Sequence, residues 1–333
     1  IVNNTITPAL DNFSNETASL QLLIQDFCAA SSATRTESNI LALQEQWITT
    51  NSAWFKLSPY LLGPLSSKDS LTAEAFWYID SFRQRGNPST NTIRSDISTS
   101  LSASTEINAE SFSGKRFNLV GLLALEVLLF ETSDTQSKAI TDILTEYQNT
   151  PRKCEILAGQ ANELNRRVTI IHNAWHKDYR STGVGYRDLL VNKKLESTFT
   201  ANNDIDGTGT PAFTRLVVSV QAHLDFLNKR SITTSAAQLS MSIWPALNHT
   251  YDSLHEFLDG TNTSRLSLYQ MMENGYDANI ITLKDNMAFF KLSIEEKNTV
   301  NFKNFAAALD GNFKRELPQA LNAELGLTFT DGD

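Results

Sequence analysis

Helical periodicity is the sequence feature that most constrains the fold of this chain. Over residues 2–30, apolar side chains recur at steps of three and four positions, which is the spacing of one face of an α-helix. These positions are Ile6, Leu10, Phe13, Ala18, Leu20, Leu23, Ile24 and Phe27. Pro8 is compatible with this helix because it falls near the first turns. No segment of the chain alternates strictly between apolar and polar residues, so we predict no long strand.

The same spacing continues along most of the 333 residues. It predicts further helices at about 37–62, 116–131, 136–149, 151–176, 212–229, 235–258, 263–276, 278–292, 294–314 and 317–325. Trp47 and Trp54 share one face of the second helix, which favours them as core anchors. The 14 glycines and 8 prolines are fewer than a turn-rich β-protein would need. We therefore predict an all-α fold.

Two polar segments divide the later part of the chain. Residues 180–185 (RSTGVG) are typical of a hinge, and residues 198–211 form a second polar loop. A third polar stretch, residues 84–115, is expected to be a connecting loop with one or two short helices. We predict two helical domains, residues 1–178 and residues 179–333, each with enough long helices to resemble a four-helix bundle.

Charge and hydropathy exclude two classes of partner. The formal net charge of −9 repels phosphate backbones, so we expect no nucleic-acid partner. The longest apolar stretch, residues 119–130, is interrupted by Glu126 and is much shorter than the ~20 residues that span a bilayer. We therefore expect a buried core helix there and no transmembrane segment. The chain begins at Ile1 rather than Met, so we expect that a preceding segment has been removed.

The two cysteines, Cys28 and Cys154, fall at expected helix ends. Cys28 lies at the end of the first helix, and Cys154 lies at the start of the helix that begins at Pro151. Such ends can meet at one pole of an up-and-down bundle, although the intervening helices do not force them to. We predict a Cys28–Cys154 disulfide in an oxidising compartment. The alternative is a pair of buried reduced thiols.

One motif carries a resemblance to a known family. Residues 121–130 (GLLALEVLLF) resemble the signature of the imelysin-like family, G-x-H-x-x-E followed by an apolar run. Gly121 and Glu126 match this signature, whereas Leu123 stands at the histidine position. Other family-like stretches follow in the same order as in the family: residues 24–30 (IQDFCAA), 47–64 (closing in LGP), 76–78 (FWY), 151–154 (PRKC) and the acidic end at 329–333.

The resemblance implies a location and a pathway. Members of this family are bacterial periplasmic or outer-membrane proteins that are named as metallopeptidases and linked to iron uptake. The resemblance therefore implies a periplasmic protein, which is free or is held at the outer membrane by a lipid upstream of Ile1. It also implies an unidentified ligand or protein partner. Iron or zinc is the implied cofactor. We expect the functional site at the domain interface, at Gly121, Leu123, Glu126, Trp77 and Tyr78.

Leu123 changes the chemistry that this motif can support. Positions three apart lie on one helix face, so a histidine and a glutamate at 123 and 126 would converge on one metal ion. Leucine has no lone pair, and a catalytic metal normally needs about three protein ligands. We therefore assign no catalytic residue. Glu126 is either a structural carboxylate partnered by an arginine or a hydroxyl, or a ligand group facing a cleft.

Other candidates for metal ligands lie outside the motif. His172 and His176 are four apart on one helix, a spacing that suits zinc, and they are weak candidates because solvated histidines are common near a helix end. A second candidate cluster comprises Asp252, His255 and Glu256. A solvated helix face is the more common explanation for such a cluster. His223 is expected to be a partly buried helix residue.

Three functional hypotheses follow from these observations. The first is a periplasmic binding protein of iron uptake, without hydrolytic activity and with its site near Glu126. The second is a metallopeptidase that uses Glu126 together with other ligands. The third is a peptide- or protein-binding module of a surface lipoprotein.

Overall fold

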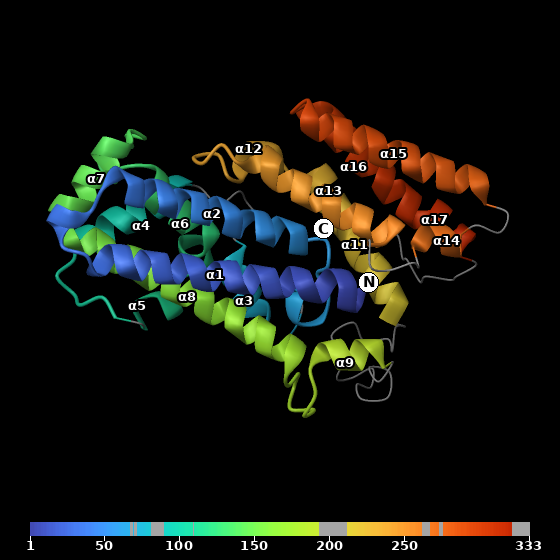
Figure 1. Ribbon diagram of the computed structural model, residues 1–333, viewed down its shortest axis with the longest axis horizontal. Coiled ribbons are helices and arrows are strands. Elements are labelled where there is room, and N and C mark those ends of the chain that lie inside the picture. The colour runs from blue at the N-terminus through green and yellow to red at the C-terminus, as the bar shows by residue number, and fades with distance from the viewer. Residues whose placement is uncertain are drawn as a thin grey trace.

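The computed structural model describes residues 1–66, 69, 72–80, 90–108, 110–192, 212–261, 267–272 and 276–321. Within these residues every regular element is a helix and no strand occurs, which confirms the predicted all-α fold. Figure 1 shows a molecule built of two neighbouring groups of helices, with the early helices in blue and green and the late ones in orange and red.

Three long helices form the frame of the first group. The antiparallel helices α1 (Thr7–Ala29) and α2 (Glu37–Leu57) pack together, and α8 (Pro151–His176) lies along α1 (Figure 1). A π-helical turn, η1 (Val2–Ile6), precedes α1. The shorter elements are η2 (Ser32–Thr34), η3 (Gly63–Leu65), α3 (Ala73–Ile79), α4 (Thr90–Ser102), α5 (Glu110–Ser113), η5 (Phe117–Leu119), α6 (Leu122–Phe130), α7 (Ile140–Asn149) and α9 (Tyr186–Val191).

The second group follows residue 212 and is joined to the first along α2. Its elements are α11 (Ala212–Lys229), α12 (Ile232–Ser235), α13 (Ile243–Asp259), α14 (Leu268–Met271), α15 (Asp277–Glu295), α16 (Thr299–Lys314) and α17 (Glu316–Ala320). Helix α16 packs against α11 and α15, whereas α13 packs mainly against α2. Helix α13 is therefore the main contact between the two groups.

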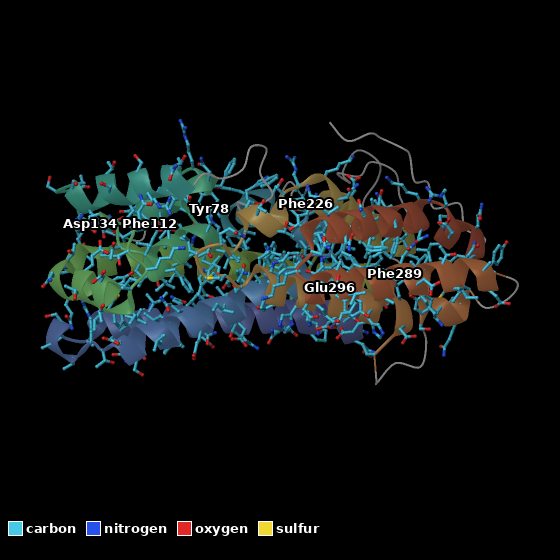
Figure 2. All side chains as sticks on the ribbon, turned by 90° about the horizontal axis from the view of Figure 1, so that it is seen from above. Tyr78, Phe112, Asp134, Phe226, Phe289 and Glu296 are labelled. Carbon is cyan, nitrogen blue, oxygen red and sulfur yellow. A yellow bond between two sulfur atoms is a disulfide. The ribbon has the colours of Figure 1, made fainter. Side chains whose placement is uncertain are left out.

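Buried side chains connect the two groups into one hydrophobic core. Figure 2 places Tyr78 and Phe112 in the first group, Phe226 near the boundary and Phe289 in the second group. Among the described helices, none is long and apolar enough to cross a bilayer. One continuous core does not by itself divide the chain into domains. The division into two domains at residue 178 therefore stays a prediction.

Helix α2 shows how the sequence produces this arrangement. Thr36 and Asn39 form a capping box that fixes its first turn. Trp47 and Trp54 are 0 % and 1 % exposed, which confirms them as core anchors. Their indole N–H groups donate to the carbonyl of Leu122 (3.0 Å) and to Asp80 Oδ2 (2.8 Å), so both rings bury their area without losing a hydrogen bond.

The main differences from the predicted helix boundaries lie in two segments. The helix predicted over 235–258 begins only at Ile243, because residues 236–242 form an irregular segment in which Ala237 and Met241 have positive φ angles of 49° and 55°. The stretch 84–115, predicted as a connecting loop with one or two short helices, contains α4 and α5, and α4 is longer than expected at 13 residues. The polar loop 198–211, the acidic end 329–333 and residues 81–89 lie outside the described residues.

The cysteines lie where α1 ends and α8 begins. The structure joins Cys28 to Cys154, with 5.4 Å between their Cα atoms. Arg35 supports this pole of the molecule, since its guanidinium donates to the carbonyls of Phe27 (3.1 Å), Cys28 (2.9 Å) and Tyr147 (2.6 Å). These contacts satisfy carbonyls in the last turns of α1 and of α7, where the helix supplies no partner.

Candidate functional site

Gly121 sets the position of the motif helix. It caps α6 with a φ of +82°, a conformation that favours glycine. A β-carbon at this position would lie 2.0 Å from the carbonyl oxygen of Tyr78. The glycine of the motif is therefore needed for a close backbone approach, which places the start of α6 against the segment that ends α3.

Helix α6 is buried on every side. All nine of its residues are buried, and Leu123 is 1 % exposed. A helix that is apolar all round belongs in a protein core. At position 123 the motif histidine is thus replaced by a packing residue that offers no ligand atom.

Glu126 is the one charged residue in this apolar helix, and it is 1 % exposed. Its Oε1 accepts hydrogen bonds from the backbone N–H of Leu239 (3.0 Å), the backbone N–H of Ser240 (2.9 Å) and Ser240 Oγ (2.9 Å). These donors belong to the irregular segment 236–242 of the second helix group. Glu126 therefore lies at the boundary between the groups and ties α6 to the segment that precedes α13.

The sequence left two interpretations of Glu126: a structural carboxylate with a partner, or a ligand group facing a cleft. The hydrogen bond from the Ser240 hydroxyl matches the first of these. Burial raises the pKa of Glu126 to about 7, and the hydrogen bonds from Ser240 and Leu239 oppose this rise. The carboxyl group is consequently half-protonated near neutral pH.

The raised pKa predicts a pH dependence of stability. Between pH 4.5 and about 7, the folded protein keeps a proton that the unfolded chain has released, so the free energy of unfolding falls as pH rises through this window. The fall is on the order of 3 kcal/mol. Glu126→Gln keeps an acceptor for the segment 239–240 and removes the ionisation. Urea unfolding at the two ends of the window should show the fall in the wild type to be greater than in Glu126→Gln. An equal fall in both proteins would mean that Glu126 ionises normally.

Trp77 and Tyr78 point toward other parts of the first group. The half-buried Trp77 ring stacks on Phe117 at a centroid distance of 6.1 Å. The Tyr78 hydroxyl donates to the carbonyl of Ser113 (2.8 Å), and its ring lies 3.9 Å from the Arg167 guanidinium carbon. The backbone of Tyr78 meets the motif at Gly121.

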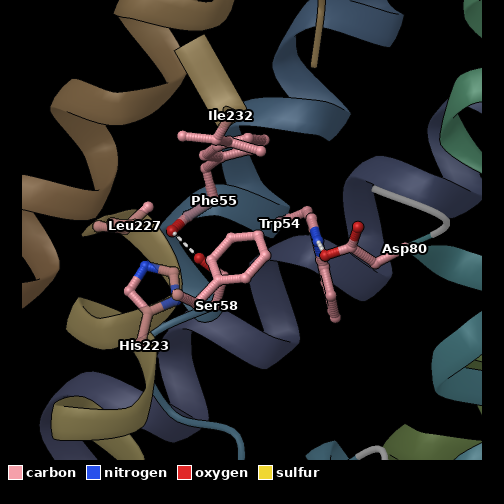
Figure 3. Close-up of a pocket in the computed structure, with 8 residues that line it drawn as sticks. Trp54, Phe55, Ser58, Asp80, His223, Leu227 and Ile232 are labelled. Carbon is pink, nitrogen blue, oxygen red and sulfur yellow. Dashed lines mark hydrogen bonds between the residues drawn. The ribbon is translucent and has the colours of Figure 1, made fainter. Parts of the chain in front are cut away.

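A small cavity lies between the two helix groups (Figure 3). Its volume is about 10 Å³, which leaves room for at most one water molecule. Its lining residues are Trp54, Phe55, Ser58, Asp80, His223, Phe226, Leu227 and Ile232. His223 is 1 % exposed, so it is more deeply buried than the sequence suggested. At this point the groups are packed closely, without a substrate-sized cleft.

A larger concavity opens at the other end of α13. This groove has a volume of about 800 Å³ and lies between the start of α1, the end of α2 and the end of α13. Its lining residues are Asn4, Thr5, Pro8, Ala9, Asn12, Lys56, His249, His255, Glu256, Asp259, Gly260 and Thr261. Helix α13 runs from the segment that holds Glu126 to this groove: His249 and Asp259 lie roughly 9 Å and 24 Å along the helix axis from Ile243, at about 1.5 Å per residue.

The three residues of the second candidate cluster, Asp252, His255 and Glu256, each have a different partner near this groove. Glu256 pairs with Lys56 of α2 across the boundary (2.9 Å), and the half-exposed His255 faces Asp259 at 3.7 Å. Asp252 accepts a long hydrogen bond from Asn248 (3.5 Å). These three side chains do not converge on one point, but Glu256 and His255 both line the groove.

His172 and His176 are brought together with a residue that the sequence did not indicate. The Nε2 atoms of both rings approach Asp11 Oδ1 of α1, at 3.0 Å and 2.7 Å. Burial and the neighbouring His176 lower the pKa of His172. Asp11 is 161 positions from His172, and no local motif marks it. Ser240 and Asp80 were missed for the same reason.

The comparisons with known proteins identify the family. The family model for imelysin matches residues 6–261, so this chain belongs to the imelysin family. No curated protein matches it. An imelysin-like protein of Psychrobacter arcticum has a similar structure, with a TM-score of 0.67, 14% identity and coverage of 98% of this chain and 95% of that one. A protein of Parabacteroides distasonis assigned as an iron-regulated protein A precursor is also similar, with a TM-score of 0.64, 14% identity and coverage of 96% and 92%.

Proposed function

We propose that this protein is a binding protein of iron uptake and not a hydrolase. The observation that carries the proposal is the state of the motif. Leu123 offers no ligand atom, and Glu126 is engaged by the N–H groups of Leu239 and Ser240 inside a closed boundary. A hydrolytic metal centre needs about three protein ligands and an open position for water or substrate. One buried and hydrogen-bonded carboxylate supplies neither.

The groove beside α13 supplies the space for a ligand that the motif region lacks. Its volume of about 800 Å³ falls in the ordinary range of small-molecule sites, and it lies between the two helix groups, where such sites are common. His249 and His255 provide imidazole groups, which suit iron. Lys56, which pairs with Glu256 (2.9 Å), can exchange this partner for a carboxylate of the ligand. We assign the groove to a carboxylate-bearing iron compound, such as a ferric chelate or haem.

The proposed location is the periplasm. The pairing of Cys28 with Cys154 supports an oxidising compartment, where a disulfide persists. The similar fold of a protein assigned as an iron-regulated protein A precursor supports the link to iron. A lipid anchor upstream of Ile1 and a protein partner in the uptake system remain part of the proposal.

Titration with haemin and with ferric citrate tests the binding function. We expect saturable binding of one of the two compounds by the wild-type protein, and a loss of affinity of about tenfold in His249→Gln or Lys56→Gln, from removal of one ligand or one charged contact. Lys138→Gln, an exposed substitution far from the groove, is the matched control and should bind as the wild type does. The assignment would be contradicted if neither compound binds to the wild type. It would also be contradicted if Lys138→Gln weakens binding as much as His249→Gln or Lys56→Gln does.

A peptidase assay tests the second part of the proposal. The protein, incubated with zinc and a denatured protein substrate, should leave the substrate intact. Cleavage that Glu126→Ala abolishes would show that the metallopeptidase hypothesis is correct. Asp11→Asn is included in both assays because Asp11 contacts the two histidines of α8. This variant should bind the iron compound in the groove as the wild type does, which would show that the histidine pair is not needed for that binding.

A further inference from the structure

Three potential ligand atoms converge on the outer face between α1 and α8. His172 and His176 lie one turn apart on α8, with their ring centroids 4.4 Å apart. Asp11 of α1 reaches both rings, and all three ligand atoms lie within 4.8 Å of one another. Among the described residues, this is the one group of three histidine, cysteine or acidic side chains that meets this distance.

The arrangement fits the chemistry of a transition-metal ion. Two imidazoles and one carboxylate form the ligand set of open zinc sites, with Zn–N distances of about 2.0–2.1 Å and Zn–O distances of about 2.0–2.2 Å. Ligand atoms around such an ion lie roughly 3–4 Å apart, so the present separations of 2.7 Å and 3.0 Å must widen slightly. The side chains are 22–43% exposed, which leaves them free to adjust and gives an ion direct access from solvent.

The two helices that carry these side chains are held in a fixed register. Trp175, which precedes His176, donates its indole N–H to Thr7 Oγ1 (3.1 Å) one turn before Asp11. Further along the same pair of helices, Gln21 and Gln25 donate to Asn162 (2.7 Å and 3.0 Å). The ligand atoms therefore do not depend on a loop for their placement, which favours a preorganised site.

We propose that Asp11, His172 and His176 form a binding site for a divalent transition-metal ion of the zinc type, with at least one coordination position open to water. In the absence of an ion, Asp11 accepts a hydrogen bond from each ring. For the ion to bind, each Nε2 must present its lone pair: a neutral ring moves its proton to Nδ1, and a protonated ring releases its Nε2 proton to the solvent. The carboxylate oxygen of Asp11 is the third ligand. This site uses none of the motif residues and lies outside the groove lining, so it does not depend on the proposed binding function.

Equilibrium dialysis against Zn²⁺, followed by metal analysis, tests this site on the whole chain. We expect one zinc ion per wild-type chain and a rise in Tm upon zinc addition. Asp11→Asn and His176→Gln should each weaken zinc binding by at least about tenfold and abolish the rise in Tm. Circular dichroism should show the wild-type helix content in both variants, because the replaced side chains are partly exposed.

Two further variants are matched controls. His255→Gln removes a histidine of the groove, and Glu126→Gln removes the motif carboxylate, so both should keep the bound zinc ion. Co²⁺ provides a second readout, since a tetrahedral or five-coordinate site gives visible absorption bands that Asp11→Asn should remove. The proposal is overturned if the wild type retains no zinc, if Asp11→Asn retains it unchanged, or if His255→Gln loses it.

Discussion

Replacing Gly121 with alanine is expected to lower the free energy of unfolding by about 4 kcal/mol or more. The new β-carbon would lie 2.0 Å from the carbonyl oxygen of Tyr78 and 2.9 Å from that of Ile79, so the backbone must move. The φ of +82° adds strain for any residue with a side chain. Urea unfolding followed by circular dichroism measures this loss.

Two other glycines separate the causes of this effect. Gly183 has a φ of +76°, and a β-carbon added there would meet no atom within 4 Å, so Gly183→Ala should show the cost of the backbone conformation alone. Gly114 has neither a positive φ nor a close neighbour, so Gly114→Ala should be nearly neutral. If Gly121→Ala costs no more than Gly183→Ala, the close approach of Tyr78 to the motif would be disproved.

Loss of the link between Cys28 and Cys154 is the other change with a large expected effect. The link closes a loop of 126 positions, and the chain-entropy model assigns about 5 kcal/mol of stabilisation to a loop of this length. The double variant Cys28→Ala, Cys154→Ala should therefore unfold at a clearly lower urea concentration than the oxidised wild type. It should also unfold at the same concentration with and without reductant.

Thiol counting checks the oxidation state directly. The denatured wild type should show no free thiol in Ellman assays until a reductant is added, and two afterwards. Equal counts before and after reduction would show two free thiols instead. Two free thiols would no longer support an oxidising compartment, whereas the groove and the site on α1 and α8 would be unaffected.

The sequence by itself determined the fold class and the positions of most helices. Apolar side chains at steps of three and four residues define helices through local geometry, and α8 spans Pro151–His176 as the pattern predicts. The burial of Trp47 and Trp54 was also predictable, because large apolar side chains on one helix face have few other places to go. The motif around Gly121, together with the order of the other family-like stretches, indicated the family.

Only the tertiary structure decided which side chains meet. Glu126 had two open interpretations, and its partner Ser240 lies 114 positions away in a segment whose amides no local pattern marks. Asp11 joins His172 because α1 and α8 pack antiparallel along their length, a contact between residues 161 positions apart. Periodicity specifies which face of a helix is buried, but the choice of neighbouring helix and its register depends on packing across the whole core.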